Sequence, residues 1–158
     1  MPKRFITLVF MLAVALIGSA PAWAGDLYGA GKEVVDGDEF VFCAGDACEN
    51  IRLCGIDTPS QGKLGYQETI AALKDLVVGK KVACRPLGSG SVCDDFRGLD
   101  NRGRTIAQCF VEEATVDVAG ALISERHACD RMIDSGGYYS KDHPEWRCAK
   151  FGEFEVKP

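Results

Sequence analysis

In five short stretches of the chain, apolar positions either alternate with polar ones or run together, and glycine, aspartate or proline separates the stretches. A period of two is typical of half-buried β-strands, and these three residue types mark the turns between strands. The pattern therefore predicts five strands, at residues 27–35, 39–43, 50–56, 81–85 and 104–111.

Two further stretches repeat their apolar residues at helical spacing. The first, at 66–78, stops before Gly79, and glycine commonly follows the last turn of a helix. Asp117 is expected to cap a second helix that runs to about Arg126. The face of the first helix that should point inward carries Ile70, Leu73 and Val77.

These elements follow the order three strands, helix, two strands, helix, which is typical of an OB-type barrel. The expected fold class is therefore α+β, mainly β, with a five-stranded OB-type barrel and two or three helices. Because a short connection at 44–47 joins the second and third strands, Asp38 and Asp57 should lie at the same end of that strand pair.

The first residues have the pattern of an export signal. Lys3 and Arg4 precede an apolar run at 5–17, and Ala22-Trp23-Ala24 is typical of a cleavage site. We expect a signal peptide at 1–24 and a periplasmic or secreted monomer without a membrane span after cleavage. The remaining length suits one domain, expected at 25–128, with a tail at 129–158 packed on it.

All eight cysteines follow the predicted signal peptide. An even number of cysteines in an exported chain predicts a disulfide framework, whereas the lack of any Cys-x-x-Cys pair argues against zinc. Sequence does not determine which cysteines pair. Our preferred bridges are Cys43–Cys48 across the hairpin and Cys129–Cys148 to the tail, with two further bridges, in an open order, among Cys54, Cys84, Cys93 and Cys109.

The charge balance opposes unaided binding to a polyanion. Without Lys3 and Arg4, 16 of the 18 Lys and Arg residues remain against 23 Asp and Glu, which leaves a net charge near −7 with His neutral. Affinity for nucleic acid comes mainly from neutralised phosphates. A nucleic-acid site on this chain therefore needs a local cluster of arginines or bound cations.

Three short motifs carry the candidate chemistry. They are Val34-Val35-Asp36-Gly37-Asp38, the segment 51–59 with sequence Ile-Arg-Leu-Cys-Gly-Ile-Asp-Thr-Pro, and Asp100-Asn101-Arg102-Gly103-Arg104. Carboxylates suit a hard cation such as Ca²⁺, and the planar fork of arginine matches a phosphate. In this order the motifs resemble the staphylococcal nuclease-like (thermonuclease) family, over roughly residues 27–128.

The resemblance implies a Ca²⁺ site. Asp38 and Asp57 would offer carboxylate oxygens to the ion, Thr58 would offer its backbone carbonyl, and Asp36 would lie close by. Taken alone, Asp36-Gly37-Asp38 is also typical of an ordinary turn. The combination of this motif with the second one, at the spacing of a hairpin, favours a metal site.

The resemblance also implies two catalytic arginines. Arg52 would hold an oxygen of the scissile phosphate, and Arg104 would stabilise the charge of the transition state. Arg102 is two residues away on the same face of an extended segment and is an alternative to Arg104, although Arg104 matches the Gly-Arg pair of the family better.

The chain departs from the family pattern at two places. Ser60 stands where the family has a glutamate that orients or deprotonates the attacking water, and a hydroxyl cannot accept that proton at neutral pH. Glu68 matches a different family residue, at the start of the helix. The nucleotide-stacking tyrosines of the family have no counterparts either, and Tyr138 and Tyr139 would replace them only if the tail folds back.

Two functions fit these observations. The first is a secreted Ca²⁺-dependent nuclease, a hydrolase acting on single-stranded DNA or RNA, that is weakened by Ser60. The second is a catalytically inactive nuclease-fold protein that serves as a periplasmic binding or assembly module. We prefer the first, because Asp38, Arg52, Asp57, Thr58 and Arg104 are all retained.

Overall fold

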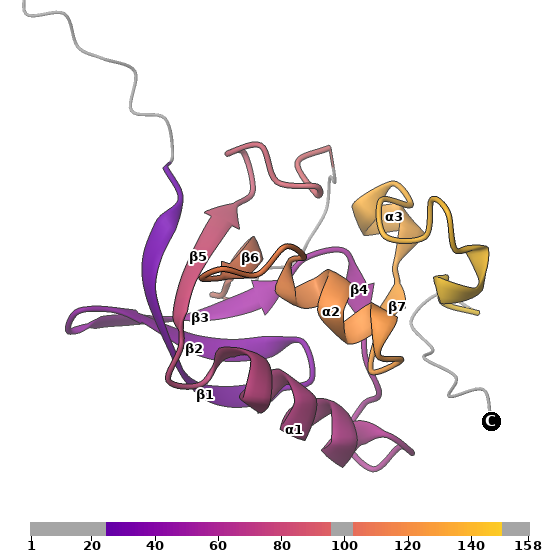
Figure 1. Ribbon diagram of the computed structural model, residues 1–158, viewed down its shortest axis with the longest axis horizontal. Helices are drawn as coiled ribbons and strands as arrows, with labels where there is room; N and C mark the ends of the chain where they lie inside the picture. Colours follow the sequence, from indigo (N-terminus) through magenta and orange to yellow (C-terminus); the bar gives the residue numbers. More distant parts are fainter. Residues whose placement is uncertain (1–24, 96–102, 150–158) are drawn as a thin grey trace, which may run out of the picture.

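Five strands close into a barrel in the computed structural model, which describes residues 25–95 and 103–149 (Figure 1). The strand order is β1-β2-β3-β6-β5, and all neighbours are antiparallel except β3 and β6, which are parallel. This confirms the predicted disulfide-stapled OB-type barrel of the α+β class. The bounds are β1 Leu27–Asp36, β2 Glu39–Ala44, β3 Ala47–Leu53, β5 Lys81–Pro86 and β6 Thr105–Val111.

The core of the barrel follows the period of two in β2 and β3. Phe40 and Phe42 point inward from β2, and Phe40 pairs across the strands with Ile51; all three side chains are buried. Gly31 lets β1 meet the end of the first helix, because a Cβ there would lie 2.3 Å from the carbonyl oxygen of Val77.

The predicted third strand is wrong at both ends. β3 begins earlier and ends at Leu53, because Gly55 adopts a left-handed conformation (φ 78°) that breaks the extended chain. Ile56–Asp57 then forms a separate strand, β4, which pairs with β7, Cys129–Asp130. Asp57 therefore belongs to a two-stranded sheet beside the barrel.

Helix α1, Tyr66–Val77, packs against β1 (Figure 1) and ends one residue before the predicted end. Its buried face carries Leu73 and Val77 as expected, but Thr69 is fully buried where Ile70 was predicted. The Thr69 hydroxyl donates to the carbonyl oxygen of His127 at 3.0 Å, and this bond fixes the helix to the segment after α2.

Helix α2, Val118–Ser124, has the predicted cap, because the Asp117 side chain accepts from the Gly120 N–H at 2.7 Å. It ends before the predicted Arg126, which has a positive φ of 65°. None of the helices in the described part of the chain is long and apolar enough to cross a bilayer.

The described part of the C-terminal segment, residues 129–149, contains three short elements. It contains β7, the short helix α3 (Met132–Ser135) and a 3₁₀ turn, η1 (Pro144–Trp146). Buried Asp130 holds these parts together by accepting hydrogen bonds from the Ser135 hydroxyl and the Ser140 N–H. Tyr139 is buried in the core, whereas Tyr138 is exposed.

Four disulfides bind these parts covalently, and no cysteine is free. The two preferred bridges, Cys43–Cys48 and Cys129–Cys148, are confirmed. The open pairs are Cys54–Cys93, beside the β3–β4 turn, and Cys84–Cys109, between β5 and β6. The predicted signal peptide, Arg102 and residues 150–158 of the tail lie outside the described residues.

Candidate functional site

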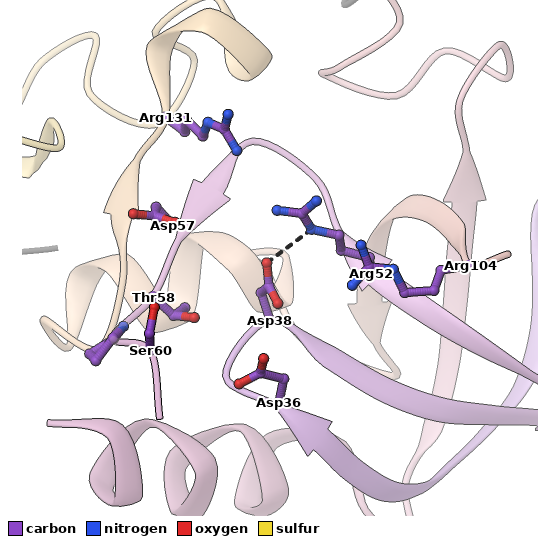
Figure 2. A pocket seen from close by; sticks show the side chains of 9 residues that line it. Asp36, Asp38, Arg52, Asp57, Thr58, Ser60, Arg104 and Arg131 are labelled. Carbon is purple, nitrogen blue, oxygen red and sulfur yellow. Dashed lines mark hydrogen bonds and ion pairs between the residues drawn. The ribbon is translucent and has the colours of Figure 1, made fainter. Parts of the chain in front are cut away.

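One pocket of about 330 Å³ brings the candidate site residues together (Figure 2). It contains every residue that the motifs marked as a metal ligand or a catalytic arginine, together with Ser60 and one arginine that the motifs did not mark. The lining residues are Asp36, Asp38, Arg52, Asp57, Thr58, Pro59, Ser60, Arg104 and Arg131.

Contact between the first two motifs depends on Gly37, in the turn between β1 and β2. A Cβ at Gly37 would lie 2.6 Å from the Thr58 hydroxyl oxygen, so only glycine lets the turn approach the segment after β4 so closely. The Gly37 N–H also donates to the Asp36 carboxylate at 2.8 Å. The Asp-Gly-Asp motif is thus a turn shaped to fit against Thr58.

Asp38 and Arg52 form an ion pair at the centre of the pocket, with 3.0 Å between Arg52 Nε and Asp38 Oδ2 (Figure 2). Burial raises the pKa of Asp38, and the positive charge of Arg52 opposes this effect. Within the described residues, Arg52 makes no other side-chain hydrogen bond. Its two terminal nitrogens are therefore available for an anion.

Arg104, just before β6, is held by a glutamate that the motifs did not mark. Its Nη1 lies 2.7 Å from Glu39 Oε2, and the other oxygen of Glu39 accepts from the Asn50 side chain at 2.8 Å. Glu39 is buried. Its place directly after Asp38 was the only feature of the sequence that could have marked it as part of the site. Arg104 and Arg52 enter the pocket from neighbouring parallel strands.

Asp57 leans toward β7 in this structure. One of its carboxylate oxygens lies within 4.8 Å of the sulfur atoms of Cys129 and Cys148. Its Oδ2 is buried and has no hydrogen-bond partner within the described residues. Burial raises the pKa of Asp57, and the nearby positive charge of Arg131 is the main opposing influence.

Arg131 is the site residue that sequence reasoning missed. It follows β7 and reaches the pocket only because β7 pairs with β4, which no motif indicated. Its Nε lies 3.3 Å from Asp134 Oδ2. Burial raises the pKa of Asp134, and Arg131 is the main opposing influence there too.

The donor atoms do not form a closed metal cage. The one set of three potential ligands found in the described chain is Asp57 with Cys129 and Cys148, and these two sulfurs are bonded to each other rather than being thiolates. Asp36, Asp38 and Asp57 do not form such a set in the described chain, so an ion shared by them would need water oxygens as further ligands, which Ca²⁺ accepts alongside carboxylate and carbonyl oxygens.

The local charge would favour a bound cation. The pocket and its immediate ion pairs contain five carboxylates and three arginines, which leaves an excess of two negative charges when all are ionised. The unpartnered oxygen of Asp57 adds a buried acceptor that a cation would satisfy. The five carboxylates belong to Asp36, Asp38, Glu39, Asp57 and Asp134.

Ser60 is exposed at the edge of the pocket, and its carbonyl oxygen accepts from the Lys63 N–H at 2.9 Å. Glu68 lies in the first turn of α1, as predicted, and is not among the residues that line the pocket. The pocket therefore has the Ser60 hydroxyl at its edge, where the resemblance would imply a carboxylate.

Comparisons with known proteins found no matching family model and no matching curated protein. The resemblance to the nuclease-like family therefore depends on the three motifs alone. The barrel adds the arrangement of those motif residues around one pocket.

Proposed function

We propose that this protein is a Ca²⁺-dependent nuclease that hydrolyses phosphodiester bonds of DNA or RNA with a low turnover. The observation that carries the proposal is the convergence of Asp38, Asp57, Arg52 and Arg104 on one pocket. Carboxylates without arginines would suit a purely structural cation site. Arginines without carboxylates would suit simple anion binding. Their combination favours metal-assisted chemistry on a phosphate.

In this mechanism the arginines bind the phosphate and the serine contacts the water. The terminal nitrogens of Arg52 donate to the non-bridging oxygens, and Arg104 stabilises the negative charge as water attacks phosphorus and the P–O bond to the leaving oxygen breaks. Ser60 accepts a hydrogen bond from that water but leaves its proton to solvent. Ca²⁺, held by Asp38, Asp57 and the Thr58 carbonyl, would supply charge neutralisation and a more acidic water.

The first prediction concerns Arg52. Arg52→Ala should lower single-turnover cleavage of a labelled single-stranded oligonucleotide by about 10²–10³-fold, because one preorganised donor to the phosphate is lost. The matched control is Arg85→Ala, which also removes an Nε-carboxylate ion pair, with Asp26 at 3.2 Å, but lies outside the pocket. Equal rates for the two variants, with both folded at the assay temperature, would contradict the role of Arg52.

The second prediction concerns Ca²⁺ and stability. A ligand that binds only the folded state stabilises it, by about 1.4 kcal/mol when its free concentration is about ten times Kd. Millimolar Ca²⁺ should therefore raise the melting temperature of the wild type, and the double variant Asp38→Asn, Asp57→Asn should lose this increase. Asp75→Asn is the control, because Asp75 is exposed on α1 and outside the pocket. An unchanged wild-type melting temperature, with and without oligonucleotide, would exclude the ion.

Ser60 favours a second candidate, a nuclease-fold binding module without catalysis. The pocket would then hold nucleic acid through its arginines and leave it intact. The cleavage assay separates the candidates, because a binding module retains the oligonucleotide without Ca²⁺-dependent products.

A further inference from the structure

A third guanidinium enters the pocket from a part of the chain that carries no motif. The Arg131 N–H donates to the carbonyl oxygen of Gly55 at 2.9 Å, so its backbone is fixed to the turn between β3 and β4. That turn lies between Arg52 and Asp57 in sequence. The Arg131 side chain lines the same pocket as these two residues.

The side chain is held from one side only. Nε faces Asp134, whose side chain is 3 % exposed, whereas the Arg131 side chain is 29 % exposed. Figure 2 shows the guanidinium extending from the end of β7 over the pocket, toward Arg52. Within the described residues its terminal nitrogens make no hydrogen bond.

The segment that carries Arg131 is held firmly in place. The Cys129–Cys148 disulfide closes it, the Cys148 N–H donates to the Asp130 carbonyl oxygen at 3.1 Å, and the buried Asp130 carboxylate accepts from the Ser140 N–H at 2.8 Å. The backbone of such a segment is already ordered before a ligand binds, so binding does not have to order it. The arrangement suits a preorganised binding group.

A purely structural role for Arg131 would be to neutralise Asp57 and Asp134. Such a role accounts for the Asp134 contact at Nε, but it leaves the terminal nitrogens without a hydrogen bond on a side chain that lines the pocket. The guanidinium groups of Arg52 and Arg131 line one pocket, and Asp134 contacts that of Arg131. An anion with several oxygens would bridge the two groups.

We propose that Arg131 binds a phosphate of single-stranded nucleic acid alongside Arg52, and that Asp134 is its positioning residue. This inference rests on the proposed function, because it takes the ligand of the pocket to be a phosphodiester chain. It assigns part of substrate binding to the C-terminal segment, outside the three motifs. The acidic chain would then bind its polyanionic ligand through three arginines in one pocket, with the proposed cation offsetting the excess of negative charge there.

The test measures binding of a fluorescent single-stranded oligonucleotide by anisotropy, in Ca²⁺, over a range of salt concentrations. A gel checks after each titration that the oligonucleotide is intact. Arg131→Gln should weaken binding by about tenfold, since a hydrogen bond to a charged group is lost. It should also reduce the slope of log K against log salt by about 0.7, the value for one lost phosphate contact on a single strand.

Two further variants separate binding from structure. Arg126→Gln removes the same charge from an exposed position outside the pocket and should change neither affinity nor slope. Asp134→Asn should weaken binding but keep the slope, because the Arg131 charge remains. If Arg131→Gln melts early, Arg131→Met, which keeps the aliphatic chain, replaces it in the titration.

The outcomes of the titration test the Arg131 inference separately from the proposed function. Wild-type affinity and slope in Arg131→Gln would overturn the inference. A wild type that does not bind the oligonucleotide would overturn it together with the proposed function. A wild type that binds without cleaving would contradict the proposed hydrolysis only, and the Arg131 inference would still be supported by a reduced slope.

Discussion

Ser60→Glu should raise the rate of Ca²⁺-dependent cleavage, by up to the roughly 10²–10⁴-fold that general-base assistance contributes in enzymes. Ser60 is exposed and lines the same pocket as Asp57 and Thr58, so a glutamate side chain at this position would extend toward the proposed phosphate site without being buried. The added carboxylate would accept the proton that the serine hydroxyl cannot. The gain should appear in the single-turnover rate rather than in oligonucleotide affinity.

The matched control is Gln61→Glu. Gln61 is the next residue, is also exposed, and does not line the pocket, so the same charge is added away from the reacting atoms. Only Ser60→Glu should accelerate cleavage. Equal small effects in the two variants would mean that the added negative charge changes only the long-range electrostatic potential of the protein. Lack of a general base would then not be what limits the wild-type rate. A Ser60→Glu variant that binds Ca²⁺ and oligonucleotide but cleaves neither DNA nor RNA would favour the non-catalytic binding module.

Removal of the Cys54–Cys93 bridge by the double substitution Cys54→Ala, Cys93→Ala should destabilise the protein strongly. The bridge spans a sequence separation of 39 residues, and both cysteines are buried. The loop-entropy relation gives about 4 kcal/mol for a loop of this length. Urea unfolding of the variant should show a lower midpoint and a slope at least as steep as that of the wild type, because the less constrained unfolded chain exposes more surface.

The matched control removes the bridge Cys43–Cys48, which closes a separation of only 5 residues at the tip of a hairpin. The same relation gives about 2 kcal/mol for this short loop. If the hairpin bridge costs as much as Cys54–Cys93, loop closure is not the main source of the stabilisation. Since a Cβ at Gly55 would lie 3.2 Å from the Cys93 sulfur, loss of the long bridge should also loosen the turn that positions Asp57.

Sequence patterns correctly predicted the elements that are stabilised by contacts between residues close together in the chain. The period of two marked β2 because Phe40 and Phe42 share one face, and the Asp117 cap marked the start of α2. The Cys43–Cys48 bridge was predictable because the hairpin pairs Cys43 directly with Cys48. Each of these features depends on residues within a few positions of one another.

The candidate site was partly predictable for a related reason. Asp36, Asp38 and Arg52 lie in two motifs joined by one hairpin, so pairing of β2 with β3 brings them together. Asp57 and Thr58 line the same pocket, but the pairing of β4 with β7 places them there. Whether these residues bind Ca²⁺ and cleave nucleic acid stays a prediction, to be tested by the experiments above.

The sequence by itself determined the strand pattern, the helix caps and the residues of the three motifs, because short-range periodicity and spacing specify them. Only the tertiary structure decided the break at Gly55, the pairing of β4 with β7, the Cys54–Cys93 and Cys84–Cys109 bridges, and the arrival of Arg131 in the pocket. Those features join residues far apart in the chain. Which of these residues meet depends on how the whole barrel packs, and a short stretch of sequence does not determine that packing.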